Sequence, residues 1–406
     1  MNSGPTEVDR VRSLREVLTA TGAGIYLSTH VAGPIPAETM TAVHESDDLE
    51  LRIGRVGLDR DDDIEQREKE ARAVAAAAIK ASPEQVLLAH GVAQAAAISS
   101  LELLTQRAAT DDGDGDGRRS RVLVLKSVAA PVLAAIRAVA SGSGARVDII
   151  DAAPQILAGD VALVVMPHVD ALGNIADVAR AGEAARSAGA RLMVDASLSV
   201  GALSVEVDSL GADVLIADTH RWLLGPDAMT LVWLSGGLGE DVPTRLRATV
   251  GPFGRATLLA VSRSIGWLLM YIELPLVLTR TAELAGRLYD SLSAIEGVEL
   301  LAEGVEQVGS SVHAAPDRVP PLAAFRINDW NAIQAAEELS RSVFAIVEAD
   351  AERDIVRASV GAWNREDEID RFIGRLTELA EHTPETLPRK PSLTVISGPA
   401  TTEDEG

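Results

Sequence analysis

The chain alternates short apolar runs with longer segments of helical periodicity from residue 65 onward. This alternation predicts an α/β domain whose mostly parallel sheet is covered by helices on both faces. In such a sheet, ligands bind beyond the carboxyl ends of the strands. The predicted strands cover residues 86–88, 121–125, 147–150, 161–166, 191–195, 213–216 and 230–233, and the predicted helices cover 65–80, 92–104, 130–140 and 176–188.

The C-terminal third has a different pattern. A long apolar helix is predicted over 262–292, followed by strands at 323–327 and 355–360 and a helix at 366–381. This order indicates a second, smaller α+β domain. We therefore divide the chain into an N-terminal segment (1–24), a large domain (25–250), a small domain (251–382) and a tail without periodicity (383–406), which we expect to be disordered.

Composition restricts the chemistry. The 406 residues include no cysteine, which excludes disulfides, thiolate metal sites and a cysteine nucleophile. The net charge of −23 disfavours nucleic acid and anionic membrane as partners. Seven histidines occur without metal-binding spacing, so no metal site is predicted. The polar N-terminus has no signal-peptide pattern, so the expected location is the cytoplasm.

An acidic, glycine-rich run at 111–117 matches the opening of a calcium-binding EF-hand loop. The twelfth position of that loop is Leu123 instead of glutamate, and a strand follows instead of a helix. A solvated surface loop is the better interpretation.

The most informative stretch is 193–225. One predicted strand ends at Asp195, and the next leads into the sequence DTHRW at 218–222. This arrangement resembles the class V aminotransferases and cysteine desulfurases, which are fold-type I pyridoxal phosphate enzymes. In that family the aspartate pairs with the pyridinium nitrogen, and a Ser/Thr-x-His-Lys or Gly-His-Lys-Trp motif supplies the lysine of the internal aldimine. The sequence LLGP that follows at 223–226 fits the same pattern.

The resemblance covers about residues 25–379. It includes the segments 26–36 and 168–173 and two C-terminal motifs, 356–360 and 363–370. It implies the fold-type I architecture, pyridoxal phosphate as cofactor and a homodimer whose active site lies at the subunit interface. The contacts that it implies are Asp195, His168, Thr219 and His220 for the cofactor, Arg357 and His30 for the substrate carboxylate, and His220 and the residue at position 221 for catalysis.

The pattern departs from the family in five places where the cofactor would lie. The lysine is replaced by Arg221, whose guanidinium stays protonated and cannot form an imine. The residue expected to bond the phenolic oxygen is Leu198, and the ring-stacking histidine aligns near Val128. The phosphate loop appears as VAQAAA at 92–97, and the segment that reaches the partner's phosphate appears as RSIG at 263–266.

Two hypotheses follow. The leading one is a degenerate family member without aldimine catalysis, acting as a partner or scaffold subunit or as a binder of a small anion. The alternative is an atypical enzyme acting on amino acids with a non-covalently held cofactor, with Arg221 on its phosphate, Asp195 on its ring nitrogen and His220 or Lys126 as acid or base. A heterodimer with a lysine-bearing paralogue is an alternative to the homodimer.

Three candidates also have structural explanations. Asp195 could pair with Arg221 or cap a turn, Arg357 could pair with an acid, and Lys126 could satisfy a nearby loop acid.

Overall fold

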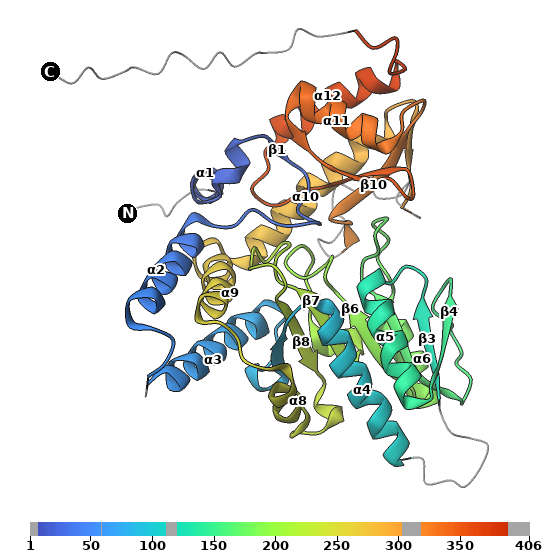
Figure 1. The fold of residues 1–406 in the computed structure, drawn as a ribbon. Helices are drawn as coiled ribbons and strands as arrows, with labels where there is room; N and C mark the ends of the chain where they lie inside the picture. Colours follow the sequence, from blue (N-terminus) through green and yellow to red (C-terminus); the bar gives the residue numbers. More distant parts are fainter. Residues whose placement is uncertain (1–6, 58, 111–119, 303–317, 389–406) are drawn as a thin grey trace, which may run out of the picture.

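The computed structural model describes residues 7–57, 59–110, 120–302 and 318–388. Its centre is a seven-stranded sheet in the order β2-β8-β7-β6-β5-β3-β4 (Figure 1). Within this sheet, β8 is the one strand that runs opposite to the other six. The predicted, mostly parallel sheet is thus confirmed. Its strands are β2 (Val86–Ala89), β3 (Arg121–Leu125), β4 (Arg146–Ile150), β5 (Val161–Pro167), β6 (Arg191–Asp195), β7 (Val214–Asp218) and β8 (Thr230–Leu234).

The order of the strands creates a topological switch point. The chain passes from β3 to the edge strand β4, returns to the other side of β3 as β5, and continues away through β6 and β7. The direction of winding therefore reverses between β3 and β5. The carboxyl ends of β3, β5, β6 and β7 all lie at one edge of the sheet, where α/β proteins bind ligands.

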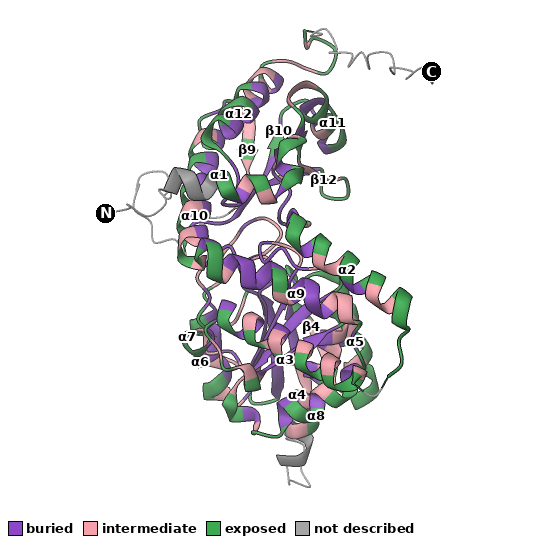
Figure 2. Cartoon of the chain, turned by 90° about the vertical axis from the view of Figure 1, so that its left-hand side faces the viewer, coloured by how far each residue is buried: buried purple, intermediate pink, exposed green. Residues whose placement is uncertain are grey.

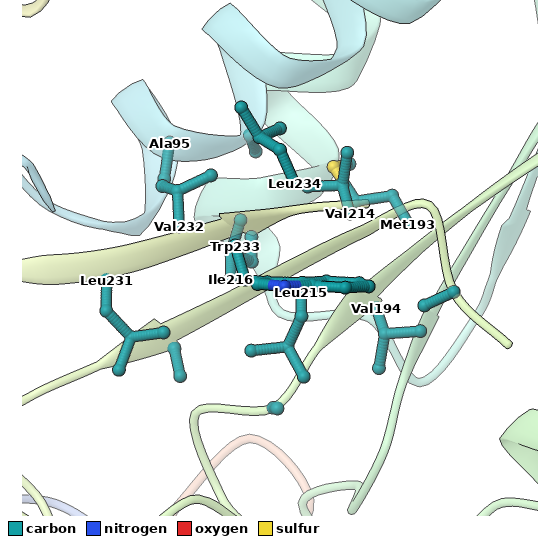
Figure 3. Close-up of a cluster of buried hydrophobic side chains, with 14 of the residues drawn as sticks. Ala95, Met193, Val194, Val214, Leu215, Ile216, Leu231, Val232, Trp233 and Leu234 are labelled. Atoms are coloured by element: carbon teal, nitrogen blue, oxygen red, sulfur yellow. The ribbon is translucent and has the colours of Figure 1, made fainter. Parts of the chain in front are cut away.

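The sheet is buried on both faces at its centre, whereas the edge strand β4 is partly exposed. Every residue of β5, β7 and β8 is buried, as expected for near-continuous apolar runs in a covered sheet. Figure 3 shows Leu215 and Leu231 on one side of the sheet and Val232 on the other, near Ala95 of α4. The helices of this domain are α2 (Ala37–Ile53), α3 (Arg60–Ala78), α4 (Val92–Thr110), α5 (Ala130–Ser143), α6 (Val178–Ala188), α7 (Val207–Leu210), α8 (Val242–Val250) and α9 (Arg255–Trp267), with short helices η2 (Pro83–Gln85) and η3 (Gly236–Leu238).

The C-terminal part has its own antiparallel sheet, in the order β12-β13-β10-β9, and its own apolar core (Figure 2). The N-terminus joins this part, because β1 (Ile25–Tyr26) pairs in parallel with β11 (Ala345–Ile346). The proposed division into domains stays a prediction. The remaining elements are α1 (Glu7–Val17), η1 (Thr19–Gly22), α10 (Leu274–Ser293), β9 (Val298–Leu300), β10 (Leu322–Ile327), α11 (Ala332–Val343), β12 (Glu348–Asp350), β13 (Ile355–Ser359) and α12 (Glu366–Ala380).

The prediction of a single helix over 262–292 is wrong. The chain forms α9, a π-helical turn η4 (Leu268–Ile272) and α10, and it bends by 86° at the break. Glu273 lies at the bend with a φ of 70°, and Pro275 opens α10. Proline is favoured in the first turn of a helix and disfavoured inside one, so it was the sequence signal for this break.

Two further points concern helices that could cross a membrane and the segments that the structure does not describe. Among the described residues, no single helix is long and apolar enough to cross a membrane; the bent pair Arg255–Ile272 and Leu274–Ser293 meets the length and composition test only when its two halves are combined. The acidic run 111–117 and the tail from 389 onward lie outside the described residues.

Candidate functional site

Strands β6 and β7 bring the central predicted residues together. They are parallel neighbours, with Asp195 opposite Ile216. Asp195 therefore ends one strand beside the turn after β7 that carries Thr219, His220 and Arg221. The sequence prediction that these residues share one edge of the sheet is confirmed by the strand order.

The Asp195 carboxylate caps a turn. Its Oδ1 accepts the backbone N–H of Ser197 at 3.0 Å, and the side chain is buried. Burial, and to a smaller extent the charge of Asp218, raises the pKa of Asp195, against the hydrogen bonds from Ser197 and the charge of Arg221. The structural explanation of this aspartate, capping a turn, is present in the molecule.

Arg221 forms an ion pair with Asp218. Asp218 was not among the site residues predicted from the sequence. A guanidinium nitrogen of Arg221 lies 3.6 Å from Asp218 Oδ2, and Thr230 Oγ1 donates to Asp218 Oδ1 at 2.7 Å. Asp218 occupies the first position of the Ser/Thr-x-His-Lys motif, where a hydroxyl group is replaced by a buried carboxylate. Two carboxylates and one guanidinium therefore form the centre of the site.

Thr219 and His168 are held by protein contacts. Thr219 Oγ1 donates to the carbonyl oxygen of Met229 at 3.1 Å. The ring Nδ1 of His168 lies 2.9 Å from Ser199 Oγ, and the His168 backbone N–H donates to the Asp195 carbonyl at 2.8 Å. Both side chains are buried. They help to fix the ends of β5, β6 and β7 relative to one another.

The N-terminal segment 28–33 packs over the turn after β7. Gly33 donates its N–H to the carbonyl of His220 at 2.7 Å. A Cβ atom at Gly33 would lie 2.1 Å from the Arg221 carbonyl oxygen, so this close approach requires glycine. Burial lowers the pKa of His220, against the attraction of Asp218.

This packing places His30 against strands β12 and β13. The Nε2 atom of His30 lies 2.6 Å from Glu348 Oε2, and its Nδ1 lies 2.8 Å from Ser359 Oγ. Arg357 donates to the other oxygen of Glu348 at 2.7 Å. The structure therefore brings Arg357 and His30 together, as predicted. They meet around the carboxylate of Glu348, a residue that was not predicted from the sequence. The pairing of Arg357 with an acid, its structural explanation, is confirmed.

The residues present do not fit covalently held pyridoxal phosphate, the cofactor that the resemblance implies. Arg221 cannot form the imine, and Asp218 places negative charge where the family motif has a hydroxyl. At the start of α4, the side-chain oxygen of Gln94 accepts the His90 N–H at 2.7 Å, and its amide donates to the Val250 carbonyl. Within the first turn of α4, no serine or threonine hydroxyl replaces the lost phosphate contact.

A cavity of about 670 Å³ lies at the switch point, beside this site. Its lining includes Lys126, Pro167 and Arg180, but none of the site residues described above. Lys126 is exposed and lies 3.9 Å from Asp151. The structural explanation of Lys126, a contact with a loop acid, is therefore present.

Replacing Asp195 with asparagine is expected to stabilise the protein at neutral pH. Asparagine keeps the acceptor for Ser197 and removes a buried charge. Because the pKa of Asp195 is raised in the folded state, the cost of its charge is absent below the pKa of the unfolded chain and is fully present above the folded-state pKa. The gain in the free energy of unfolding of Asp195→Asn over the native chain should therefore shrink as the pH falls. Urea unfolding at several pH values would measure it.

The exposed Asp151→Asn variant is the matched control, and we expect almost no change in its stability. A loss of stability in Asp195→Asn at neutral pH would contradict the prediction, because attraction to Arg221 would then outweigh burial.

Comparisons with known proteins agree with this architecture. The family model "Aminotransferase class-V" matches residues 25–372. The chain is 23% identical to a probable cysteine desulfurase of Methanothermobacter thermautotrophicus, over 54% of this chain and 60% of that protein. It thus spans only about 60% of the length of such curated relatives.

Among solved structures, the apo cysteine desulfurase of Thermococcus onnurineus NA1 matches with a TM-score of 0.73 at 18% identity, covering 91% of this chain and 98% of that one. A lysine-to-alanine mutant of C-DES, solved with glycine covalently linked to its PLP cofactor, matches with a TM-score of 0.70 at 15% identity, covering 89% and 98%. At such identities these structures establish the fold. On the extent of the family match, the chain belongs to the class V aminotransferase family.

Proposed function

We propose that this chain is a family member that does not use conventional aldimine chemistry and acts as a non-catalytic partner subunit or as a binder of a small anion. The observation that carries this proposal is Arg221, which stands at the lysine position and is engaged by the buried Asp218. An arginine in that ion pair offers no neutral amine. The proposed location is the cytoplasm.

Binding of a small anion is supported by unpaired polar atoms near His30 and the turn after β7. Thr29 Oγ1, Arg221 Nε and Arg357 Nε are buried and have no hydrogen-bond partner among the described residues. All three can donate a hydrogen bond. The charges of Arg221 and Arg357 both act on His30, so both guanidinium groups lie in its neighbourhood. Because an unsatisfied buried donor costs about 1–3 kcal/mol, an anionic ligand that accepts from them would be favoured.

A second subunit is also proposed, either a copy of this chain or a lysine-bearing paralogue. Its support is an apolar surface on η4, where Met270 is 74% exposed and Tyr271 is 71% exposed. Exposed apolar side chains that lie side by side favour a protein contact.

The proposal is tested by absorption spectra of the purified protein with and without added pyridoxal phosphate, followed by borohydride reduction and intact mass. We expect no reduced adduct for the native chain or for Arg221→Lys, because Asp218 and the lost phosphate contacts remain in that variant. We also expect no turnover of L-alanine or L-cysteine by either protein.

A reduced adduct together with turnover by Arg221→Lys would overturn the proposal. A saturable band without covalent addition would instead favour the atypical enzyme with non-covalently held cofactor.

A further inference from the structure

Glu348 makes the contacts that a bound carboxylate ligand would make. One oxygen receives a hydrogen bond from Arg357 at 2.7 Å, and the other lies 2.6 Å from the ring of His30. A guanidinium and an imidazole that hold the two oxygens of one carboxylate form a charge-assisted anion site. In this chain, the carboxylate comes from the protein itself.

The site is rigidly built. His30 is 1% exposed, and its backbone N–H donates a hydrogen bond to Ser359 Oγ at 2.9 Å. The Ser359 hydroxyl can then donate to His30 Nδ1, which leaves the proton of a neutral imidazole on Nε2, facing Glu348. Burial raises the pKa of Glu348, but the hydrogen bonds and charges of His30 and Arg357 outweigh it and hold the pKa below the usual value. Glu348 is therefore charged at neutral pH.

Strand register fixes Glu348 in place. Glu348 and Arg357 are directly opposite one another in the antiparallel pair β12–β13, and residues in that position lie on the same face of a sheet. The carboxylate is thus held beside the guanidinium by the backbone. A free carboxylate must compete with a group whose effective concentration is in the mM range or higher.

We propose that Glu348 is an internal ligand that fills the anion site of Arg357 and His30 and thereby excludes the carboxylate of free amino acids. The inference rests on the proposed function and deepens it, since it specifies which anions the chain rejects. An anionic ligand of the native chain would have to bind elsewhere, beside Arg221, or displace Glu348. Glu348 is in this sense a residue that determines specificity.

The experiment compares the native chain, Glu348→Ala and Glu348→Gln with Asp350→Asn as matched control. Asp350 is on the same strand and 3.8 Å from Arg357, but its closer partner is Arg353 at 2.7 Å. Isotope-labelled acetate and L-alanine are titrated by NMR, with L-alaninamide as the probe that lacks a carboxylate. We expect Glu348→Ala to bind both carboxylates on the order of 10- to 100-fold more tightly than the native chain or Asp350→Asn, and alaninamide to show no gain.

A thermal-shift measurement keeps the test informative if Glu348→Ala is weakly folded. Acetate at constant ionic strength should raise the Tm of Glu348→Ala more than that of the native chain, because a ligand that binds only the folded state stabilises it. Glu348→Gln, which keeps the shape of the side chain, should fold and bind the carboxylates more tightly than the native chain. Equal affinity of all four proteins for L-alanine, or no rescue of Glu348→Ala by acetate, would overturn the inference. Either failure is separate from the borohydride test, which concerns Arg221 and the cofactor.

Discussion

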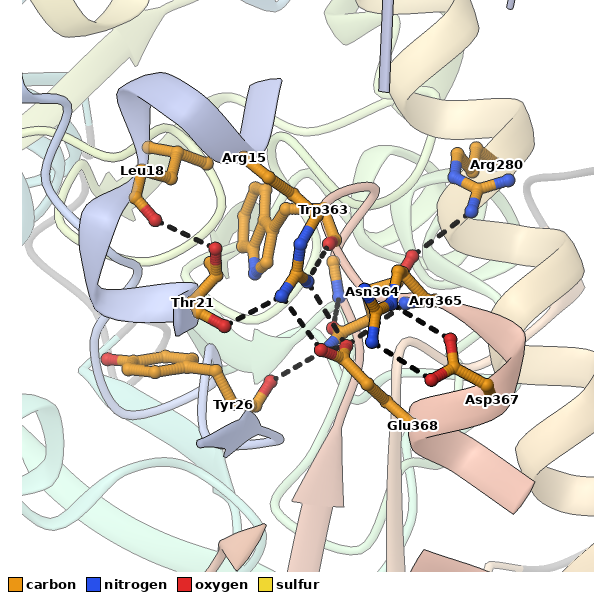
Figure 4. Close-up of polar contacts among 11 residues, drawn as sticks. Arg15, Leu18, Thr21, Tyr26, Arg280, Trp363, Asn364, Arg365, Asp367 and Glu368 are labelled. Atoms are coloured by element: carbon orange, nitrogen blue, oxygen red, sulfur yellow. Dashed lines mark hydrogen bonds and ion pairs between the residues drawn. The ribbon is translucent and has the colours of Figure 1, made fainter. Parts of the chain in front are cut away.

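Replacing Glu368 with alanine is expected to lower the free energy of unfolding by about 3 kcal/mol, because it removes a buried carboxylate and leaves the half-buried Arg15 without its ion-pair partner. Glu368 is 2% exposed, and its carboxylate lies 2.8 Å from the guanidinium of Arg15 (Figure 4). It also accepts the Arg365 N–H at 3.1 Å at the start of α12. Arg15 itself donates to the carbonyls of Thr21 and Trp363, both at 2.7 Å. Urea unfolding followed by tryptophan fluorescence would measure the loss.

The control for this experiment is Glu366→Ala on the same helix turn. The Glu366 side chain is 56% exposed and lies 3.4 Å from Arg280, an interaction that solvent screens. We expect a cost below about 1 kcal/mol. Equal costs for the two variants would contradict the importance of burial for the Arg15–Glu368 pair.

Replacing Trp222 with alanine is expected to cost about 3–5 kcal/mol, the range for truncating a large buried aromatic side chain. Trp222 is fully buried in an apolar cluster with Leu14, Trp267 and Trp363. Its indole N–H donates to the carbonyl of Val360 at 2.9 Å. Since Trp222 directly follows Arg221, its loss should also loosen the turn after β7. The same unfolding experiment provides the measurement.

Trp222→Phe separates the two contributions of this side chain. Phenylalanine keeps most of the apolar volume but leaves the Val360 carbonyl without the indole donor. We therefore expect a smaller loss than in Trp222→Ala. A Trp222→Phe variant as unstable as Trp222→Ala would show that the hydrogen bond, and not the packing, dominates.

Strands β5, β7 and β8 could be predicted because each is a near-continuous apolar run, buried along its whole length. Their order could not, since apolar character does not determine which strands are neighbours. The prediction of one continuous helix over 262–292 was wrong because the sequence is apolar on both sides of the bend. Only Pro275 marked the break. The amphipathic helices α2 and α11 were not predicted at all.

Part of the candidate site could likewise be predicted from the sequence, and part could not. Asp195 and Arg221 could be placed together because each follows a parallel strand, and the ends of such strands share an edge. Glu348 could not be found, because its role depends on the register that sets it opposite Arg357. Asp218 was visible in the motif, but only its burial beside Asp195 shows how it changes the charge of the site.

The parallel pairing of β1 with β11 has a consequence for synthesis. Ile25 is synthesised 320 positions before its partner Ala345. All seven strands of the large sheet are made in the interval, so that sheet can form first, as domains generally do. Strand β1 must wait unpaired until β11 has been synthesised. A nascent chain stalled before residue 345 should therefore leave β1 open to proteases even when the seven-stranded sheet has already formed.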